Sequence, residues 1–268
     1  MMKFALLCSG SKGNSFLLRD EHSCILVDCG STKHYLNQCF EQLDFDPSEI
    51  DAVLITHDHS DHVAQVGMFA DHLIYSPVEL KVPTQHIEPE KPLTIGHLTV
   101  TPVELSHDAP HTVGYIFQSW QEKLVYITDT GYVKYSYVPL LKGADYIVLE
   151  SNHDVEMLMH TSRPAYLKAR IAGDDGHLCN EDCASLLQEI VTPRTKQIVL
   201  AHISQEANTR QKALSAAAQA LQQVKDSLNP HLQLAAAGQF EMIRGGSDEK
   251  VDLGSVVWSA GMECDSEH

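Results

Sequence analysis

The segment that most constrains this chain is THDHSDH, residues 56–62, which directly follows an apolar, strand-like run. It places three imidazoles and two carboxylates within six residues. These groups together suit Zn²⁺, Mn²⁺ or iron better than Mg²⁺ or Ca²⁺. In an extended stretch the side chains of His57 and His59 leave on the same side and can share one metal. Asp61 and His62 would then turn towards a second metal. A polar turn whose histidines only cap backbone groups is the alternative interpretation.

Four further residues follow strand-like runs in order along the chain: Asp28 in ILVDCG, His107 in ELSHD, Asp129 in YITDTG and His202 in VLAH. With the His-x-His-x-Asp-His segment, they make the chain resemble the metallo-β-lactamase superfamily, in which this pattern is the signature of binuclear hydrolases. The resemblance implies an α/β fold, the four-layer αβ/βα sandwich. It also implies two divalent metal ions, Zn²⁺ or Mn²⁺, with iron as a further choice.

The resemblance also implies how the metal ligands are shared. The expected ligands form two groups of three, which are His57, His59 and His107 for the first metal and Asp61, His62 and His202 for the second. Asp129 is expected to bridge the metals, with a water or hydroxide that completes the bridge and serves as the nucleophile. Asp28 is expected to orient a ligand imidazole or the loop backbone. We count Asp28 and Asp61 among the catalytic residues.

Two segments narrow the resemblance, ESNHD at residues 150–154 and GHLCN at residues 176–180. Both look like motifs of the small bacterial WalJ/VicX-type, or YycJ-like, exonucleases, which act on DNA ends. The second segment is also similar to the one that supplies a phosphate-contacting histidine in tRNA 3′-processing relatives. By this resemblance His177 is the expected general acid, and Glu150 is expected to orient it.

The remaining chain alternates between strand-like and helical patterns. Strands are expected at residues 3–8, 23–28, 51–56, 98–105, 113–118, 123–128, 145–150 and 196–201. Helices are expected at residues 32–43, 63–71, 180–191 and 206–226. Asn180 is the expected N-cap of the third helix, with acidic residues in its first turn. We expect a single domain over residues 1–245 and an acidic, flexible tail over residues 246–268.

Composition bears on partners and location. The net charge of −17 disfavours tight non-specific DNA binding, although bound cations add positive charge where a substrate phosphate would sit. The sequence contains no apolar run of about 18 residues, so it does not predict a membrane span. Seven cysteines, an odd number spread irregularly, favour free thiols and a cytoplasmic location. Lys168 and Arg170 suit either a phosphate contact or a solvated helix face.

The expected function is therefore a binuclear metal-dependent phosphodiesterase, a nuclease of the exonuclease type that acts on DNA. Two alternatives are weighed against it. The first is a phosphodiesterase of a small cyclic phosphate or nucleotide. The second, less favoured, is a thioesterase-type hydrolase of the same fold, because the segment around His177 favours phosphate chemistry.

Overall fold

The computed structural model describes residues 1–247, 258 and 259. In these residues the strands form two mixed sheets. The strands of the first sheet, in spatial order, are β14 (Ile243–Gly246), β1 (Lys3–Cys8), β2 (Ser15–Arg19), β3 (Cys24–Val27), β4 (Ala52–Leu54), β5 (Leu73–Ser76) and β6 (Gln85–His86). Those of the second sheet are β15 (Trp258–Ser259), β13 (Gln233–Ala236), β12 (Gln197–Ala201), β11 (Tyr146–Glu150), β10 (Lys123–Ile127), β9 (Val113–Gln118), β8 (Leu98–Glu104) and β7 (Leu93–Ile95).

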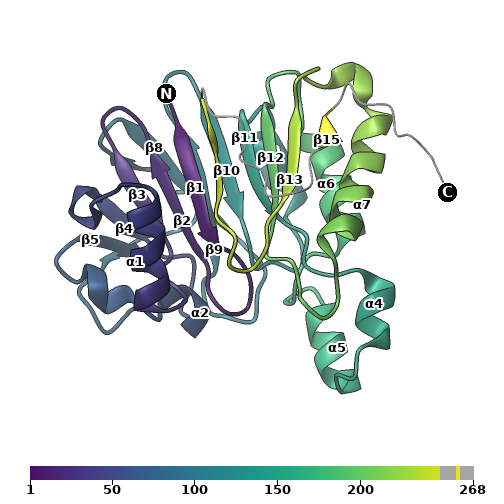
Figure 1. Ribbon diagram of the computed structural model, residues 1–268, viewed down its shortest axis with the longest axis horizontal. Helices are drawn as coiled ribbons and strands as arrows, with labels where there is room; N and C mark the ends of the chain where they lie inside the picture. The colour runs from purple at the N-terminus through teal and green to yellow at the C-terminus, as the bar shows by residue number, and fades with distance from the viewer. Residues whose placement is uncertain (248–257, 260–268) are drawn as a thin grey trace.

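Helices cover the outer faces of the two sheets (Figure 1). The α-helices are α1 (Lys33–Gln42), α2 (Ser60–Val63), α3 (Val138–Leu141), α4 (Val155–His160), α5 (Ala165–Ile171), α6 (Asn180–Ile190) and α7 (Arg210–Gln223). The 3₁₀ turns are Pro47–Glu49, Val66–Phe69, Tyr135–Tyr137 and Lys225–Ser227. None of the helices in the described part of the chain combines the length and the apolar character needed to cross a bilayer.

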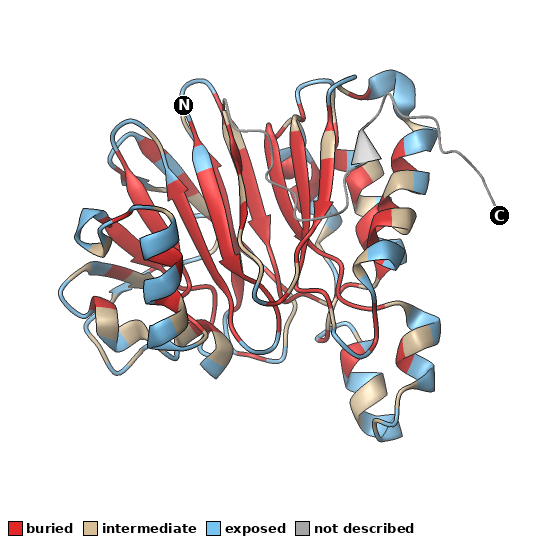
Figure 2. Cartoon of the chain, in the orientation of Figure 1, coloured by how far each residue is buried: buried red, intermediate tan, exposed pale blue. Residues whose placement is uncertain are grey.

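Three apolar clusters hold the layers together. The central cluster lies between the sheets, where the ring centroids of Phe16 and Tyr126 are 4.9 Å apart. A second cluster joins the first sheet to Leu36 and Phe40 of α1, and a third packs α6 and α7 on the second sheet. Figure 2 shows the strands buried along most of their length and the helices buried on their inner sides only. Strands covered on both faces read as continuous apolar runs, which is why the sequence reveals them. The predicted four-layer sandwich is confirmed.

All eight predicted strands are present, and three of the four predicted helices are present, with the ends of α1 and α6 within one residue and those of α7 within four residues of expectation. The helix expected at residues 63–71 is wrong. The chain forms only the short α2 and the 3₁₀ turn Val66–Phe69 there. The backbone carbonyls of Asp61 and His62 accept from the amides of Asn14 and Cys29, so they are not available to continue the helix.

The N-cap of α6 and the C-terminal segment were also predicted from the sequence. The N-cap of α6 is Cys179 and not Asn180, because the Cys179 Sγ accepts from the Asp182 amide at 3.4 Å. Asn180 is instead buried, and its Oδ1 accepts from the Ser151 hydroxyl at 2.7 Å. The predicted tail, residues 246–268, lies largely outside the described residues. Within that range the structure describes Gly246 and Ser247 and the short β15, which pairs antiparallel with β13.

Candidate metal centre

The predicted ligands all follow strands that end at one end of the sandwich. β3 and β4 run parallel, as do β10, β11 and β12, so the carboxyl ends of the strands in each set lie at one edge of their sheet. Asp28 directly follows β3, His202 directly follows β12, and Asp129 lies two residues beyond β10. The loop after β4 leads into α2, at the lower end of the molecule in Figure 1. The fold therefore brings residues far apart in sequence to one place.

The first group of predicted ligands forms a compact cluster. His57, His59 and His107 each offer an atom within 4.8 Å of the others. The His107 Nδ1 donates to the Gly176 carbonyl at 3.1 Å, and the His57 Nδ1 donates to the Thr56 hydroxyl at 3.0 Å. Both rings therefore leave Nε2 as the atom available to a ligand.

The second group lies beside the first. Asp61, His62 and His202 also offer atoms within 4.8 Å of one another. The Asp129 carboxylate lies between the groups, with its oxygens 3.2 Å from the His62 Nε2, 3.3 Å from the His202 Nε2 and 3.9 Å from the His107 Nε2. The structure thus brings all seven predicted ligands together around Asp129.

These donors fit divalent metal ions. Among the described residues, the Nε2 atoms of His57 and His202 are buried and have no hydrogen-bond partner. A buried polar atom left without a partner costs about 1–3 kcal/mol, which coordination to a metal would offset. Burial and the neighbouring imidazoles lower the pKa of His57, so its ring is neutral and its lone pair is free. Imidazole and carboxylate donors are those that Zn²⁺ and Mn²⁺ accept.

Asp28 holds the first-sheet side of the cluster. It is fully buried, and its oxygens accept from the Thr56 amide at 2.9 Å, the Thr56 hydroxyl at 2.8 Å and the His62 Nδ1 at 2.7 Å. Burial lowers the pKa of His62, but Asp28 and Asp129 outweigh it and raise that pKa well above its ordinary value. The hydrogen bond to Asp28 keeps a proton on the His62 Nδ1 and fixes the ring in one orientation, and a metal ion at Nε2 would displace the second proton that the raised pKa implies.

Glu150, at the end of β11 in the second sheet, orients ligand rings as Asp28 does in the first sheet. Its Oε1 accepts from the His177 Nδ1 at 2.8 Å and from the His202 Nδ1 at 3.0 Å, and its Oε2 accepts from the Thr130 amide at 2.8 Å. Burial raises the pKa of this carboxyl, but His177 and His202 outweigh burial and hold it at about 2. Glu150 is thus an ionised carboxylate that orients two imidazoles at once.

The comparison with known protein families decides the class of this site. The model of a family described as "Beta-lactamase superfamily domain" matches residues 24–203. The chain belongs to this superfamily. The predicted family and the predicted fold are confirmed.

Relatives within the superfamily are similar over most of the chain. The chain is 34% identical over 237 residues to exodeoxyribonuclease YycJ of Bacillus anthracis, across 83% of this chain and 90% of the relative. It is 35% identical over 228 residues to exodeoxyribonuclease WalJ of Streptococcus pneumoniae, across 79% of this chain and 85% of the relative. The chain therefore also belongs to the YycJ/WalJ family.

Solved structures show the same fold at lower identity. The metallo-β-lactamase fold protein YhfI of Bacillus subtilis matches with a TM-score of 0.66 at 20% identity, over 91% of this chain and 99% of that chain. The short form of human tRNase Z matches with a TM-score of 0.59 at 17% identity, over 90% of this chain and 98% of that chain.

Three residues of this superfamily site have strained backbones. Asp28, Asp129 and His202 adopt φ values of 56°, 61° and 52° in the left-handed region. Such a conformation costs of order 1–3 kcal/mol for a residue other than glycine, although Asp and His tolerate it better than most. The turn at each strand end directs the side chain into the cluster.

Sequence reasoning missed three side chains at the site. The Asn14 Nδ2 lies 2.9 Å from the His62 Nε2, and the Asn152 Nδ2 donates to the His202 carbonyl at 2.8 Å. Asp108 has a carboxylate oxygen 3.3 Å from the His107 Nε2. Asn14 lies in a glycine-rich turn that the sequence displays, but its partner could not be read from the sequence.

Gly30 fixes the loop that carries the ligands, and its replacement should destabilise the protein. A Cβ at this position would lie 1.7 Å from the Asp61 carbonyl oxygen and 2.8 Å from the Asn14 amide nitrogen. We expect Gly30→Ala to lower the free energy of unfolding by about 3 kcal/mol or more, measured by urea denaturation. Gly67→Ala is the matched control, because nothing lies within 4 Å of its Cβ position. Equal stability of the two variants would contradict the prediction.

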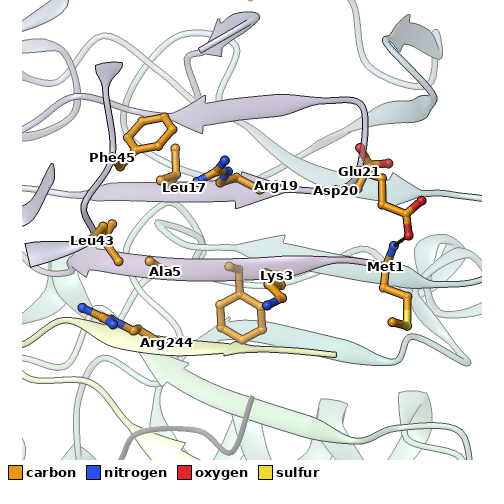
Figure 3. Close-up of a pocket in the computed structure, with 11 residues that line it drawn as sticks. Met1, Lys3, Ala5, Leu17, Arg19, Asp20, Glu21, Leu43, Phe45 and Arg244 are labelled. Carbon is orange, nitrogen blue, oxygen red and sulfur yellow. Dashed lines mark hydrogen bonds and ion pairs between the residues drawn. The ribbon is translucent and has the colours of Figure 1, made fainter. Parts of the chain in front are cut away.

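A pocket on another part of the surface contains none of these residues (Figure 3). It lies over β1 and β2 and is lined by apolar side chains together with the charged residues Lys3, Arg19, Asp20, Glu21 and Arg244. Because no predicted ligand or catalytic residue lines it, we do not assign the chemistry to this pocket.

Proposed function

We propose that the chain is a binuclear metal-dependent phosphodiesterase that acts as an exonuclease on DNA ends. The observation that carries the proposal is the position of the buried Asp129 carboxylate between the two groups of predicted ligands. Membership of a family whose relatives are named exodeoxyribonucleases supports DNA as the substrate. The family membership agrees with the prediction of a metal-dependent hydrolase of the nuclease or phosphodiesterase class.

The seven predicted ligands would hold the metals in the two groups described above, with Asp129 shared between them. Zn²⁺ and Mn²⁺ both fit this donor set, with iron as a further choice. Two divalent cations held there would lower the pKa of a bound water molecule and would neutralise charge on the scissile phosphate. Asp28 and Glu150 fix the rings of His62 and His202, so the ligands are oriented before metal or substrate binds.

His177 is the proposed general acid. Its Nδ1 donates to the ionised Glu150, which leaves Nε2 as the atom that can give a proton to the leaving oxygen. The ring stacks on His202 with centroids 5.1 Å apart, and 21% of the side chain is exposed. The imidazole is therefore beside the ligands and still open to a substrate.

A small cyclic phosphate or nucleotide is the alternative substrate, and the net charge of −17 is the observation that favours it. An acidic surface repels a long polyanion more strongly than a small one. A thioesterase-type reaction is less favoured, because the Glu150–His177 pair suits protonation of a leaving alkoxide. For the location we propose the cytoplasm, because the six cysteines of the described residues are free thiols.

The test is a metal analysis followed by hydrolysis assays on the full chain. We expect two divalent ions per chain and stepwise shortening of end-labelled duplex or single-stranded DNA with Mn²⁺ or Zn²⁺. Chelation should remove both the ions and the activity. Turnover of cyclic nucleotides without shortening of DNA would favour the alternative, and full activity after metal removal would contradict the proposal.

A further inference from the structure

Asp108 lies against the first ligand group but is not one of the seven predicted ligands. Its Oδ1 is 3.3 Å from the His107 Nε2 and 3.7 Å from the His59 Nε2. Its other oxygen, Oδ2, accepts from the Nε and a terminal nitrogen of the Arg170 guanidinium. The carboxylate therefore spans the gap between the proposed metal position and an arginine of α5.

The Oδ1 atom is placed where an oxygen bound to the first metal would be. Donor atoms bound to one metal at about 2.0–2.1 Å lie about 3–3.5 Å apart in four- or five-coordinate sites. The distances from Asp108 to His107 and His59, 3.3 Å and 3.7 Å, are close to this range. Since His57, His59, His107 and Asp129 would supply four donors to the first metal, the Asp108 oxygen lies where a fifth donor, an oxygen from outside the chain, would bind.

The ion pair between Asp108 and Arg170 is easier to separate than the contacts of the buried ligands. The Asp108 side chain is 21% exposed and that of Arg170 is 59% exposed, whereas Asp129 is 3% exposed. Exposed ion pairs contribute only about 0–1 kcal/mol. Helices α4 and α5 project from the body of the sandwich (Figure 1), and α5 is anchored by a small cluster around Leu158, Ile171 and Ala207. Little free energy therefore opposes separation of Asp108 from Arg170.

We propose that Asp108 stands in for a substrate phosphate in the free protein, and that Arg170 binds that phosphate once Asp108 is displaced. This inference rests on the metal site and the phosphodiester substrate of the proposed function. A guanidinium binds carboxylate and phosphate oxygens with the same fork-shaped geometry, so one anion can replace the other. Arg170 is thus a substrate-binding residue, and Asp108 competes with the substrate for both Arg170 and the first metal.

The test measures binding of inorganic phosphate to the metal-loaded full chain by isothermal titration calorimetry. Asp108→Asn removes the competing charge and should tighten phosphate binding about tenfold or more, since charged hydrogen bonds are worth about 1.5–3 kcal/mol. Arg170→Gln should weaken it by up to about fivefold, because an ion pair of this exposed side chain is worth at most about 1 kcal/mol. Arg163→Gln is the matched control, because Arg163, in the turn between α4 and α5, pairs with Glu206 at 2.9 Å and is not paired with Asp108 or a predicted ligand in the described residues. That variant should bind phosphate as the unaltered chain does.

Metal content, measured on the same samples, separates the proposal from its alternative. If Asp108 is a permanent ligand, Asp108→Asn will lose metal and bind phosphate more weakly, which overturns the inference. Unchanged phosphate affinity in Arg170→Gln, whose exposed site leaves folding intact, also overturns it. A wrong exonuclease assignment would give a different result. DNA would remain uncut, while phosphate affinity would still rise in Asp108→Asn and fall in Arg170→Gln.

Discussion

Replacing Asp129 with alanine should reduce phosphodiester hydrolysis at least about 10³-fold and lower the metal content below two ions per chain. The Asp129 oxygens lie close to ligands of both groups, so its loss should remove a donor from each metal. Metal ions supply several kcal/mol of transition-state stabilisation, and each 1.36 kcal/mol is a factor of ten in rate. The measurements are elemental analysis and the initial rate of DNA hydrolysis.

The matched control for this prediction is Asp226→Ala. Asp226 is an exposed carboxylate in the 3₁₀ turn Lys225–Ser227, outside both groups of predicted ligands. It should retain the full rate and the full metal content. An Asp129→Ala protein with two bound ions and an unaltered rate would rule out the shared-carboxylate arrangement.

Replacing His177 with alanine should lower kcat for DNA by about 10²–10⁴-fold and leave the metal content unchanged. A general acid matters most when the leaving group is a poor one, such as the alkoxide released from DNA. The loss should therefore be much smaller with bis(p-nitrophenyl) phosphate, whose phenolate leaves without help from a proton. Comparing kcat of the two substrates separates loss of a proton donor from general damage to the site.

His160→Ala is the control for the His177 variant, because His160 is an exposed histidine of α4 whose Nδ1 donates to the Glu156 carbonyl of its own helix. It should behave as the unaltered protein with both substrates. Equal losses with DNA and with the p-nitrophenyl ester would make His177 a positioning residue and not the proton donor.

Several site positions could be predicted because they follow strands that are apolar and buried throughout, namely β3, β4 and β12. The runs ILV before Asp28 and VLA before His202 end where the strands end, and the next residue is polar. In parallel strands this change marks the edge of the sheet at which sites form. The apolar pattern therefore predicts where the site residues lie along the chain, and the resemblance to the superfamily predicts which ligands share a metal.

Contacts between distant loops could not be predicted in the same way. Arg170 and Asp108 are 62 positions apart, and nothing in the sequence selects one partner among 36 acidic side chains. Helices α4 and α5 were missed because, at six and seven residues, they are too short to show a helical period. The helix expected at residues 63–71 does not form, because the backbone carbonyls of Asp61 and His62 accept hydrogen bonds from distant parts of the chain, which the local sequence pattern does not reveal.

The two sheets contribute opposite halves of the ligand cage. His57, His59, Asp61 and His62 come from the first sheet, and His107, Asp129 and His202 come from the second. Bound ions would therefore act as inorganic cross-links across the sandwich, comparable to a disulfide between two strands. Loss of the ions would remove these cross-links, so metal removal should loosen this end of the sandwich.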